Sequence, residues 1–89
     1  MRAVITVIGK DTVGILAKVT GICAKYNVNV TDVSQTIMQE LFAMNMLADI
    51  DGLTAPYGAF ADEMGALGDE LGLKVHVMHE DIFNSMHRI

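Results

Sequence analysis

The segment from Phe42 to Ile50 has the most regular pattern in the chain, because apolar residues occupy every second position. Successive side chains of a strand point to opposite faces of a sheet, so this pattern separates one apolar face from a mixed one. Such alternation is typical of an antiparallel sheet that is covered on one face only. The residues predicted to be buried are Phe42, Met44, Met46, Ala48 and Ile50.

Other segments carry the patterns of three more strands and two helices. Continuous β-branched or alternating residues indicate strands, and apolar residues recurring every three or four positions indicate helices. The predicted strands are 3–8, 28–37, 42–50 and 73–78, and the predicted helices are 13–26 and 56–71. The alternation in the second strand slips at Asp32, which predicts a bulge or bend. The polar pair Gln39 and Glu40 then predicts an antiparallel hairpin.

This order of elements predicts an α+β fold, the ferredoxin-like βαββαβ sandwich. Its four-stranded antiparallel sheet carries both helices on one face, with the first and third strands in the centre. Asp81 can cap a short C-terminal helix in which Ile82, Met86 and Ile89 share a face. The other face of the sheet is then left bare. The length of 89 residues allows one core and excludes a multidomain enzyme.

Four stretches resemble the ACT domains, which are small regulatory modules that bind amino acids. They are IGKDTVGIL at 8–16, YNVNV at 26–30, VSQT at 33–36 and FAMNM at 42–46. The likeness implies a single ACT domain over 1–89, with a core at about 2–80 and a helical tail at 81–89. The short chain is similar to free-standing ACT proteins that are related to the regulator of bacterial glycine cleavage genes.

Gly14 is the centre of the candidate site, at the turn from the first strand into the first helix. Its lack of a side chain lets a ligand carboxylate approach the amide groups that begin the helix. Asp11 could hold the ligand's ammonium group, and Asn29 offers a donor and an acceptor. The resemblance implies that the ligand lies between this loop and the second strand of a neighbouring subunit. The predicted ligand-binding residues are Asp11, Thr12, Val13, Gly14, Ile15 and Asn29.

Each of these residues also has a purely structural interpretation. Gly14 could serve helix-to-strand packing alone, and Asp11 could serve only as a helix cap. Asn29 could be an ordinary residue of an edge strand. These alternatives stay open at the level of the sequence.

The charge and the reactive residues argue against several other functions. A net charge of −5 disfavours nucleic acid and membrane surfaces as partners. His76 and His79 point to opposite faces of a strand, so a metal site is not expected. Neither a nucleophile nor an acid/base pair is visible, and Asp49 and Asp51 fit a solvated turn. No enzymatic activity and no cofactor are therefore expected.

The sequence thus predicts a cytoplasmic regulatory module that forms a homodimer or a higher homo-oligomer. The single cysteine, Cys23, fits a core position in a reducing compartment. The expected ligand is a small amino acid or a related metabolite, and a regulated protein is a further possible partner. The alternative is a protein–protein interaction module without a small-molecule ligand.

Overall fold

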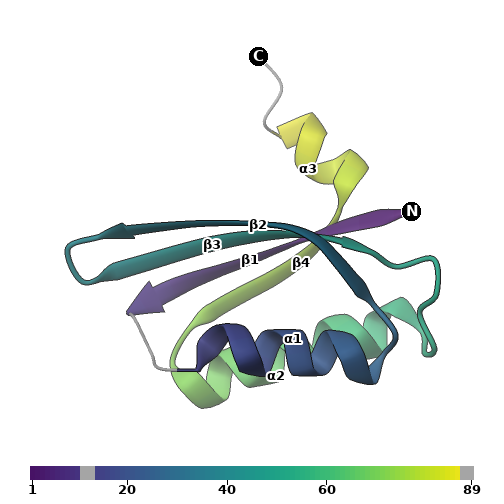
Figure 1. The fold of residues 1–89 in the computed structure, drawn as a ribbon, viewed down its shortest axis with the longest axis horizontal. Coiled ribbons are helices and arrows are strands. Elements are labelled where there is room, and N and C mark those ends of the chain that lie inside the picture. The colour runs from purple at the N-terminus through teal and green to yellow at the C-terminus, as the bar shows by residue number, and fades with distance from the viewer. Residues whose placement is uncertain (11–13, 87–89) are drawn as a thin grey trace.

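The ferredoxin-like sandwich predicted from the order of elements is confirmed. The computed structural model describes residues 1–10 and 14–86, except for the side chains of Met38 and Met86. The sheet has the order β2-β3-β1-β4, and α1 and α2 cover one of its faces (Figure 1). The elements are β1 (Arg2–Lys10), α1 (Ile15–Lys25), β2 (Asn29–Met38), β3 (Leu41–Asp49), α2 (Tyr57–Leu71), β4 (Lys74–His79) and α3 (Glu80–Met86).

The core lies between the sheet and the two helices. All five residues of 42–50 that were predicted to be buried are buried. Phe60 and Met64 of α2 and Cys23 of α1 are fully buried against them. Burial raises the pKa of the Cys23 thiol to about 11, which keeps it protonated and unreactive. The prediction that this cysteine belongs to the core is confirmed.

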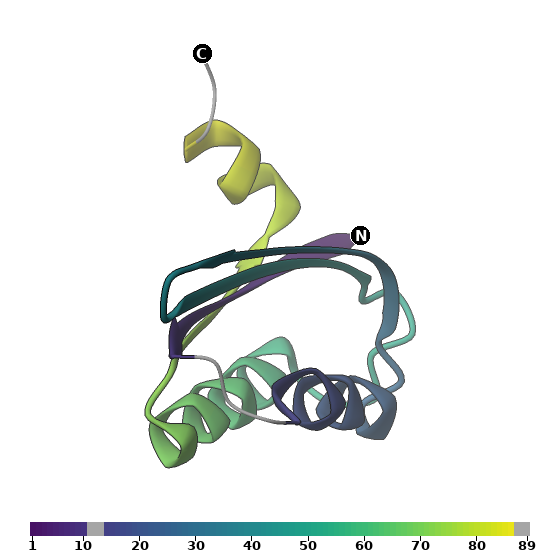
Figure 2. The ribbon, with the colours of Figure 1, turned by 60° about the vertical axis from the view of Figure 1, so that its left-hand side comes forward.

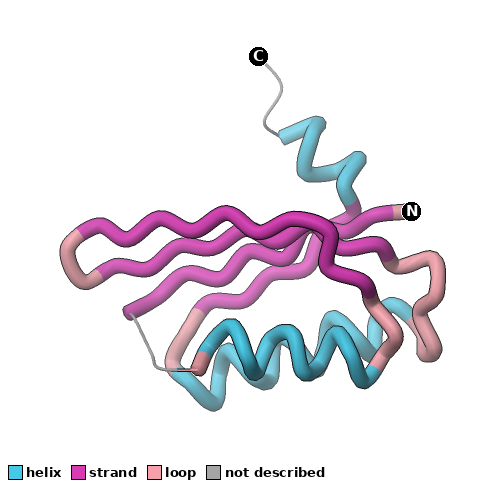
Figure 3. The backbone as a smooth tube through the Cα atoms, viewed as in Figure 1, coloured by secondary structure: helices cyan, strands magenta, loops and turns pink. Residues whose placement is uncertain are grey.

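Strand β2 contains the irregularity that the sequence predicts. Its pairing with β3 shifts register between Val30 and Asp32. The hydroxyl of Thr31, the residue in between, donates a hydrogen bond of 3.1 Å to the Leu47 carbonyl oxygen. A tight turn then joins β2 to β3, drawn in pink in Figure 3. Its first residue, Gln39, has a φ of 54°, a left-handed value that suits short hairpin turns.

The ends of the helices differ in detail from the predictions. Helix α1 begins at Ile15, two residues later than predicted. Asp11, the alternative helix cap, lies outside the described residues. Helix α3 begins at Glu80, directly after β4, so Asp81 lies inside its first turn and is not its cap. The strand continues into the helix without a loop, and this leaves no separate capping position.

A polar cluster joins α1 to α2 at the surface. The Lys25 ammonium nitrogen lies 2.9 Å from Oε1 of Glu63, and the Tyr26 hydroxyl donates to the same oxygen at 2.8 Å. The Tyr26 ring also packs edge-on against Phe60, with 5.7 Å between ring centroids. The hydrogen bonds from Lys25 and then Tyr26 lower the pKa of the Glu63 carboxyl group. The cluster therefore favours the ionised form of Glu63.

The contribution of Glu63 to stability is expected to depend on pH. Because folding lowers its pKa, the contribution is complete above the ordinary glutamate value of about 4.3 and is lost as pH falls through the lower folded value. Urea unfolding at about pH 7 should show Glu63→Gln to be less stable than the parent chain, and the difference should shrink at about pH 3. The exposed Glu70 of the same helix supplies the control, Glu70→Gln. An equal difference at both pH values would contradict the assignment.

Candidate functional site

Gly14 has the backbone geometry and the free space that the predicted site requires. It is the residue that precedes α1, with a φ of 83°, a left-handed value that favours glycine. A Cβ atom placed there would meet no atom within 4 Å. The position of a side chain at Gly14 is therefore open among the described residues. None of these residues packs so closely there that a glycine would be required.

The first turn of α1 offers donors to this space. The Lys18 amide donates to the Gly14 carbonyl oxygen at 3.0 Å, which is the first bond of the helix. The amide groups of the three residues in between have no acceptor within the helix, as at any helix start. They also carry the partial positive charge of the helix N-terminus. A carboxylate is the group that such donors bind best.

Ile15 does not have the exposed side chain of a ligand-binding residue. Its side chain is 3% exposed and belongs to the core. The buried side chain anchors the start of the helix, and only the backbone amide of Ile15 is available to a ligand. Asp11, Thr12 and Val13 lie outside the described residues, and their contacts with a ligand remain predictions.

Asn29 is exposed at the start of β2 and pairs with Asp49 of β3. Gly14 precedes α1, and β2, which Asn29 begins, starts near the other end of that helix (Figure 1). At 1.5 Å per residue, the 11 residues of α1 separate the two by roughly 16 Å. One copy of the chain therefore does not bring Gly14 and Asn29 together, and a shared site needs a second copy.

The side of the molecule formed by α1 and β2 carries exposed apolar side chains. We call Leu16, Val33 and Ile37 the edge patch. Their side chains are 40%, 37% and 59% exposed. Val33 and Ile37 pair with the buried Met46 and Phe42, so they point to the same face of the sheet as the helices, yet they remain uncovered. An open strand edge beside exposed apolar residues is typical of an interaction surface.

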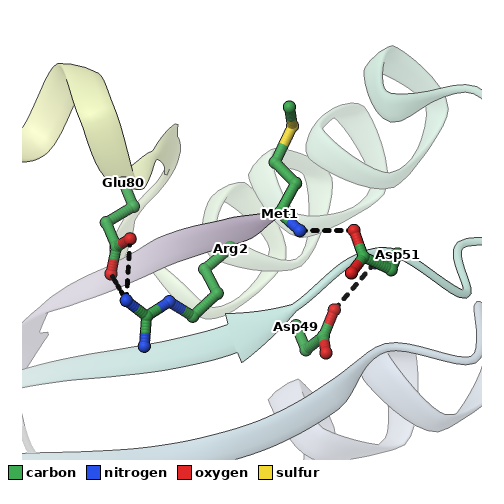
Figure 4. Close-up of polar contacts among 5 residues, drawn as sticks. All are labelled: Met1, Arg2, Asp49, Asp51 and Glu80. Atoms are coloured by element: carbon green, nitrogen blue, oxygen red, sulfur yellow. Dashed lines mark hydrogen bonds and ion pairs between the residues drawn. The ribbon is translucent and has the colours of Figure 1, made fainter.

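The two aspartates near the end of β3 form a turn, as predicted. Asp49 accepts a hydrogen bond of 2.9 Å from the Asp51 backbone amide. The Asp51 carboxylate pairs with the Met1 amino group (Figure 4). Both carboxylates are therefore engaged in local structure.

His76 and His79 follow the prediction, whereas the outer face of the sheet is not wholly bare, since Val4 on that face is 7% exposed. His76 pairs with Thr6 and shares its outer face of the sheet, whereas the His79 ring stacks on Tyr57 of α2 at 4.7 Å. At the centre of the outer face, the Thr6 hydroxyl donates to Oδ1 of Asn45 at 2.8 Å. The histidines thus lie on opposite faces. Residues 1–10 and 14–86 contain no group of three side chains suited to hold a metal ion.

Sequence reasoning missed two shallow hollows beside α3. One has a volume of about 270 Å³ and includes Asp32, Asn45 and Phe83 in its lining. The other has about 410 Å³ and includes His76 and Phe83. No local pattern could have found them, because they depend on how α3 turns over the sheet. Within the part of the chain that the structure describes, no helix is long and apolar enough to cross a membrane.

A family model, a relative in sequence and a solved structure all match nearly the whole chain. A family model described as the ACT domain matches residues 2–78. The chain is 48% identical to a UPF0237 protein of Listeria innocua over 89 residues, which cover all of both chains. It resembles the solved structure of an ACT domain protein from Streptococcus pneumoniae, with a TM-score of 0.79, 36% identity and 93% of each chain covered.

A more distant structure shares the fold alone. It is described as a candidate glycine cleavage system transcriptional repressor, and it matches with a TM-score of 0.68 and 22% identity. The match covers 85% of this chain and 43% of the other.

Proposed function

The chain belongs to the ACT domain family, and from this premise we propose that it is a regulatory module that binds a small amino acid between two copies of itself. The ligand's carboxylate lies on the amide groups that begin α1, beside Gly14. Its ammonium group lies near Asp11, and Asn29 of the second copy completes the site. The module has no catalytic activity of its own and acts in the cytoplasm.

The observation that carries this proposal is the open, left-handed Gly14 in front of α1. The φ of 83° at Gly14 favours glycine whether or not a ligand binds there. The additional feature is that, among the described residues, a Cβ atom at this position would meet no atom within 4 Å. A glycine retained for packing alone would have a close neighbour, as Gly9 has in Leu73. The lack of such a neighbour beside the helix start supports room for a ligand there.

The position of Asn29 supports a homodimer. In the proposed dimer the two-fold axis lies on the α1 and β2 side of the molecule and is perpendicular to α1, so the two α1 helices are antiparallel. The start of one α1 then lies beside the end of the other, which brings Gly14 of one copy to Asn29 of the second. The edge patch of Leu16, Val33 and Ile37 lies on this same side and supplies apolar area to the contact.

Regulation follows from this arrangement by linkage. A ligand that contacts both copies binds the dimer better than the monomer, so it stabilises the dimer by that difference in affinity. A regulated protein that recognises the dimer would then respond to the concentration of the ligand. The chain itself needs no chemical step.

A thermal-shift screen against the standard amino acids tests the proposal. At least one amino acid is expected to raise the melting temperature, since a ligand at about 100 times its Kd adds about 2.7 kcal/mol to stability. Gly14→Asp should abolish the rise, because its carboxylate repels that of the ligand, while aspartate tolerates positive φ better than most residues. Gly21→Asp is the control, because Gly21 lies within α1. A Cβ there would also meet no atom within 4 Å among the described residues.

Two results would contradict the amino acid proposal. The first is that no amino acid raises the melting temperature of the parent chain. The second is a shift that Gly14→Asp and Gly21→Asp reduce equally, which would place the ligand elsewhere. In the first case the chain would be better explained as an interaction module that uses the edge patch without a metabolite.

A further inference from the structure

Helix α3 shelters one end of the outer face of the sheet. The first residue of the helix, Glu80, pairs with Arg2 of β1, with 2.8 Å between Nη2 and Oε2 (Figure 4). Figure 2 shows α3 on the side of the sheet opposite α1 and α2. Val4 of β1 points to this face and is 7% exposed, whereas Ile8, on the same strand and face, is 39% exposed. The sheltered end of the face is therefore the end near Val4.

A hollow of about 270 Å³ lies in this sheltered region. Val4 and Leu47 of the sheet line it with apolar side chains, and Phe83 of α3 adds an aromatic ring. Asn84 of α3 and Asn45 of β3 add two amide groups. The hollow thus combines carbon surface with hydrogen-bonding groups, as binding sites for small molecules do.

The lining of the hollow is negatively charged. It includes the carboxylates of Asp32 and Glu80 and no lysine or arginine. Arg2 neutralises Glu80 from outside the lining. Asp32 forms no hydrogen bond or ion pair through its side chain with any group that the structure describes in 1–10 and 14–86. The Asp32 carboxylate in the lining therefore remains uncompensated, on a chain whose net charge is −5.

We propose that this hollow binds a small organic cation, a primary ammonium compound that also carries a hydroxyl group. The Asp32 carboxylate accepts hydrogen bonds from the ammonium group. Ser34, the next residue of β2 on this face, and the amide groups of Asn45 and Asn84 bind the hydroxyl group. The carbon atoms of the ligand lie against Val4, Leu47 and Phe83.

The volume of the hollow, about 270 Å³, is close to the roughly 300 Å³ at which pockets for drug-sized ligands start. A small molecule therefore fits it. The site shares no residue with the amino acid site proposed at Gly14 and Asn29. Each proposal can therefore fail without affecting the other.

Three probes of similar size and different charge test the site: ethanolamine, ethylene glycol and glycolate. They are titrated at neutral pH and constant ionic strength, and two-dimensional amide NMR spectra are recorded. Ethanolamine is expected to bind at least about tenfold more tightly than the other two, with saturable shifts at Asp32, Ser34, Asn45 and Asn84. The signals of Gly14 and Asn29 should stay in place, which separates this site from the proposed amino acid site.

Two variants with the same change in charge identify the carboxylate. Asp32→Asn should weaken ethanolamine binding at least about tenfold, while Asp62→Asn on the exposed side of α2 should leave it within about twofold. Both spectra must first show the dispersion of the folded parent chain. A third variant, Asn84→Leu, removes an amide group from α3 and should weaken binding without altering the charge.

Four results would overturn the proposal. They are no saturable shift up to about 50 mM ethanolamine, equal binding of ethylene glycol or glycolate, unchanged binding by Asp32→Asn, and an equal loss in Asp62→Asn. The last result would mean that ethanolamine responds only to the net charge of the protein.

Discussion

Ile37→Lys is expected to turn the proposed homodimer into monomers and to abolish the amino acid's thermal shift at the same time. Ile37 is the most exposed member of the edge patch, at 59%. A lysine there would place a charge in the apolar contact between the copies and remove apolar contact area. Disruption of an important apolar interface residue costs about 2 kcal/mol or more, so the dimer Kd should rise at least about thirtyfold.

Sedimentation velocity over a concentration series measures this effect. Leu41→Lys is the matched control, because Leu41 is 45% exposed at the same end of the sheet but points to the outer face. The control should remain a dimer and keep its thermal shift. If Ile37→Lys stayed dimeric while Leu41→Lys dissociated, the copies would meet through the outer face, and the site between Gly14 and Asn29 would be wrong.

Two glycine-to-alanine changes in α2 are expected to alter stability in opposite directions. A Cβ on Gly68 would lie 2.9 Å from the Leu73 carbonyl oxygen and 2.9 Å from Cγ2 of Val75. Because the first of these is a backbone atom, the helix must move away from β4, at a cost of roughly 1–3 kcal/mol. At Gly65 a Cβ would meet no atom within 4 Å, so Gly65→Ala should gain up to about 1 kcal/mol of helix propensity.

Urea unfolding of the two variants and the parent chain measures both changes in the free energy of unfolding. A stabilised Gly68→Ala would show that α2 and β4 do not pack as closely as the structure indicates. Close packing explains Gly68 but not the other two glycines of this helix, since a Cβ at Gly58 or Gly65 would meet no atom within 4 Å among the described residues.

The types of element and their buried faces were predictable because their signals are local. The alternation of 42–50 and the helical spacing of Phe60 and Met64 identify buried faces without knowledge of any distant residue. The slip at Asp32 likewise identified the bulge. Some predicted boundaries of the elements were wrong, such as the start of α3, which is Glu80. The end of a strand and the start of a helix depend on a few competing hydrogen bonds.

The candidate site was predictable only in part. The sequence places Gly14 in front of a helix, and the glycine signal is strong because few other residues adopt its φ of 83°. The sequence did not reveal that the Ile15 side chain is buried, which leaves only its backbone amide for a ligand. In the first turn of a helix, the sequence does not show which side chain points to the core. That depends on how the helix is oriented on the sheet.

By itself, the sequence determined the order of strands and helices, the buried faces and the glycine that precedes α1. These features depend on residues within a few positions of each other. Only the tertiary structure decided that Val33 and Ile37 stay uncovered and that a hollow with Asp32 in its lining lies beside α3. Each of these depends on the distance between residues far apart in the chain, and that distance is set by how the helices cross the sheet.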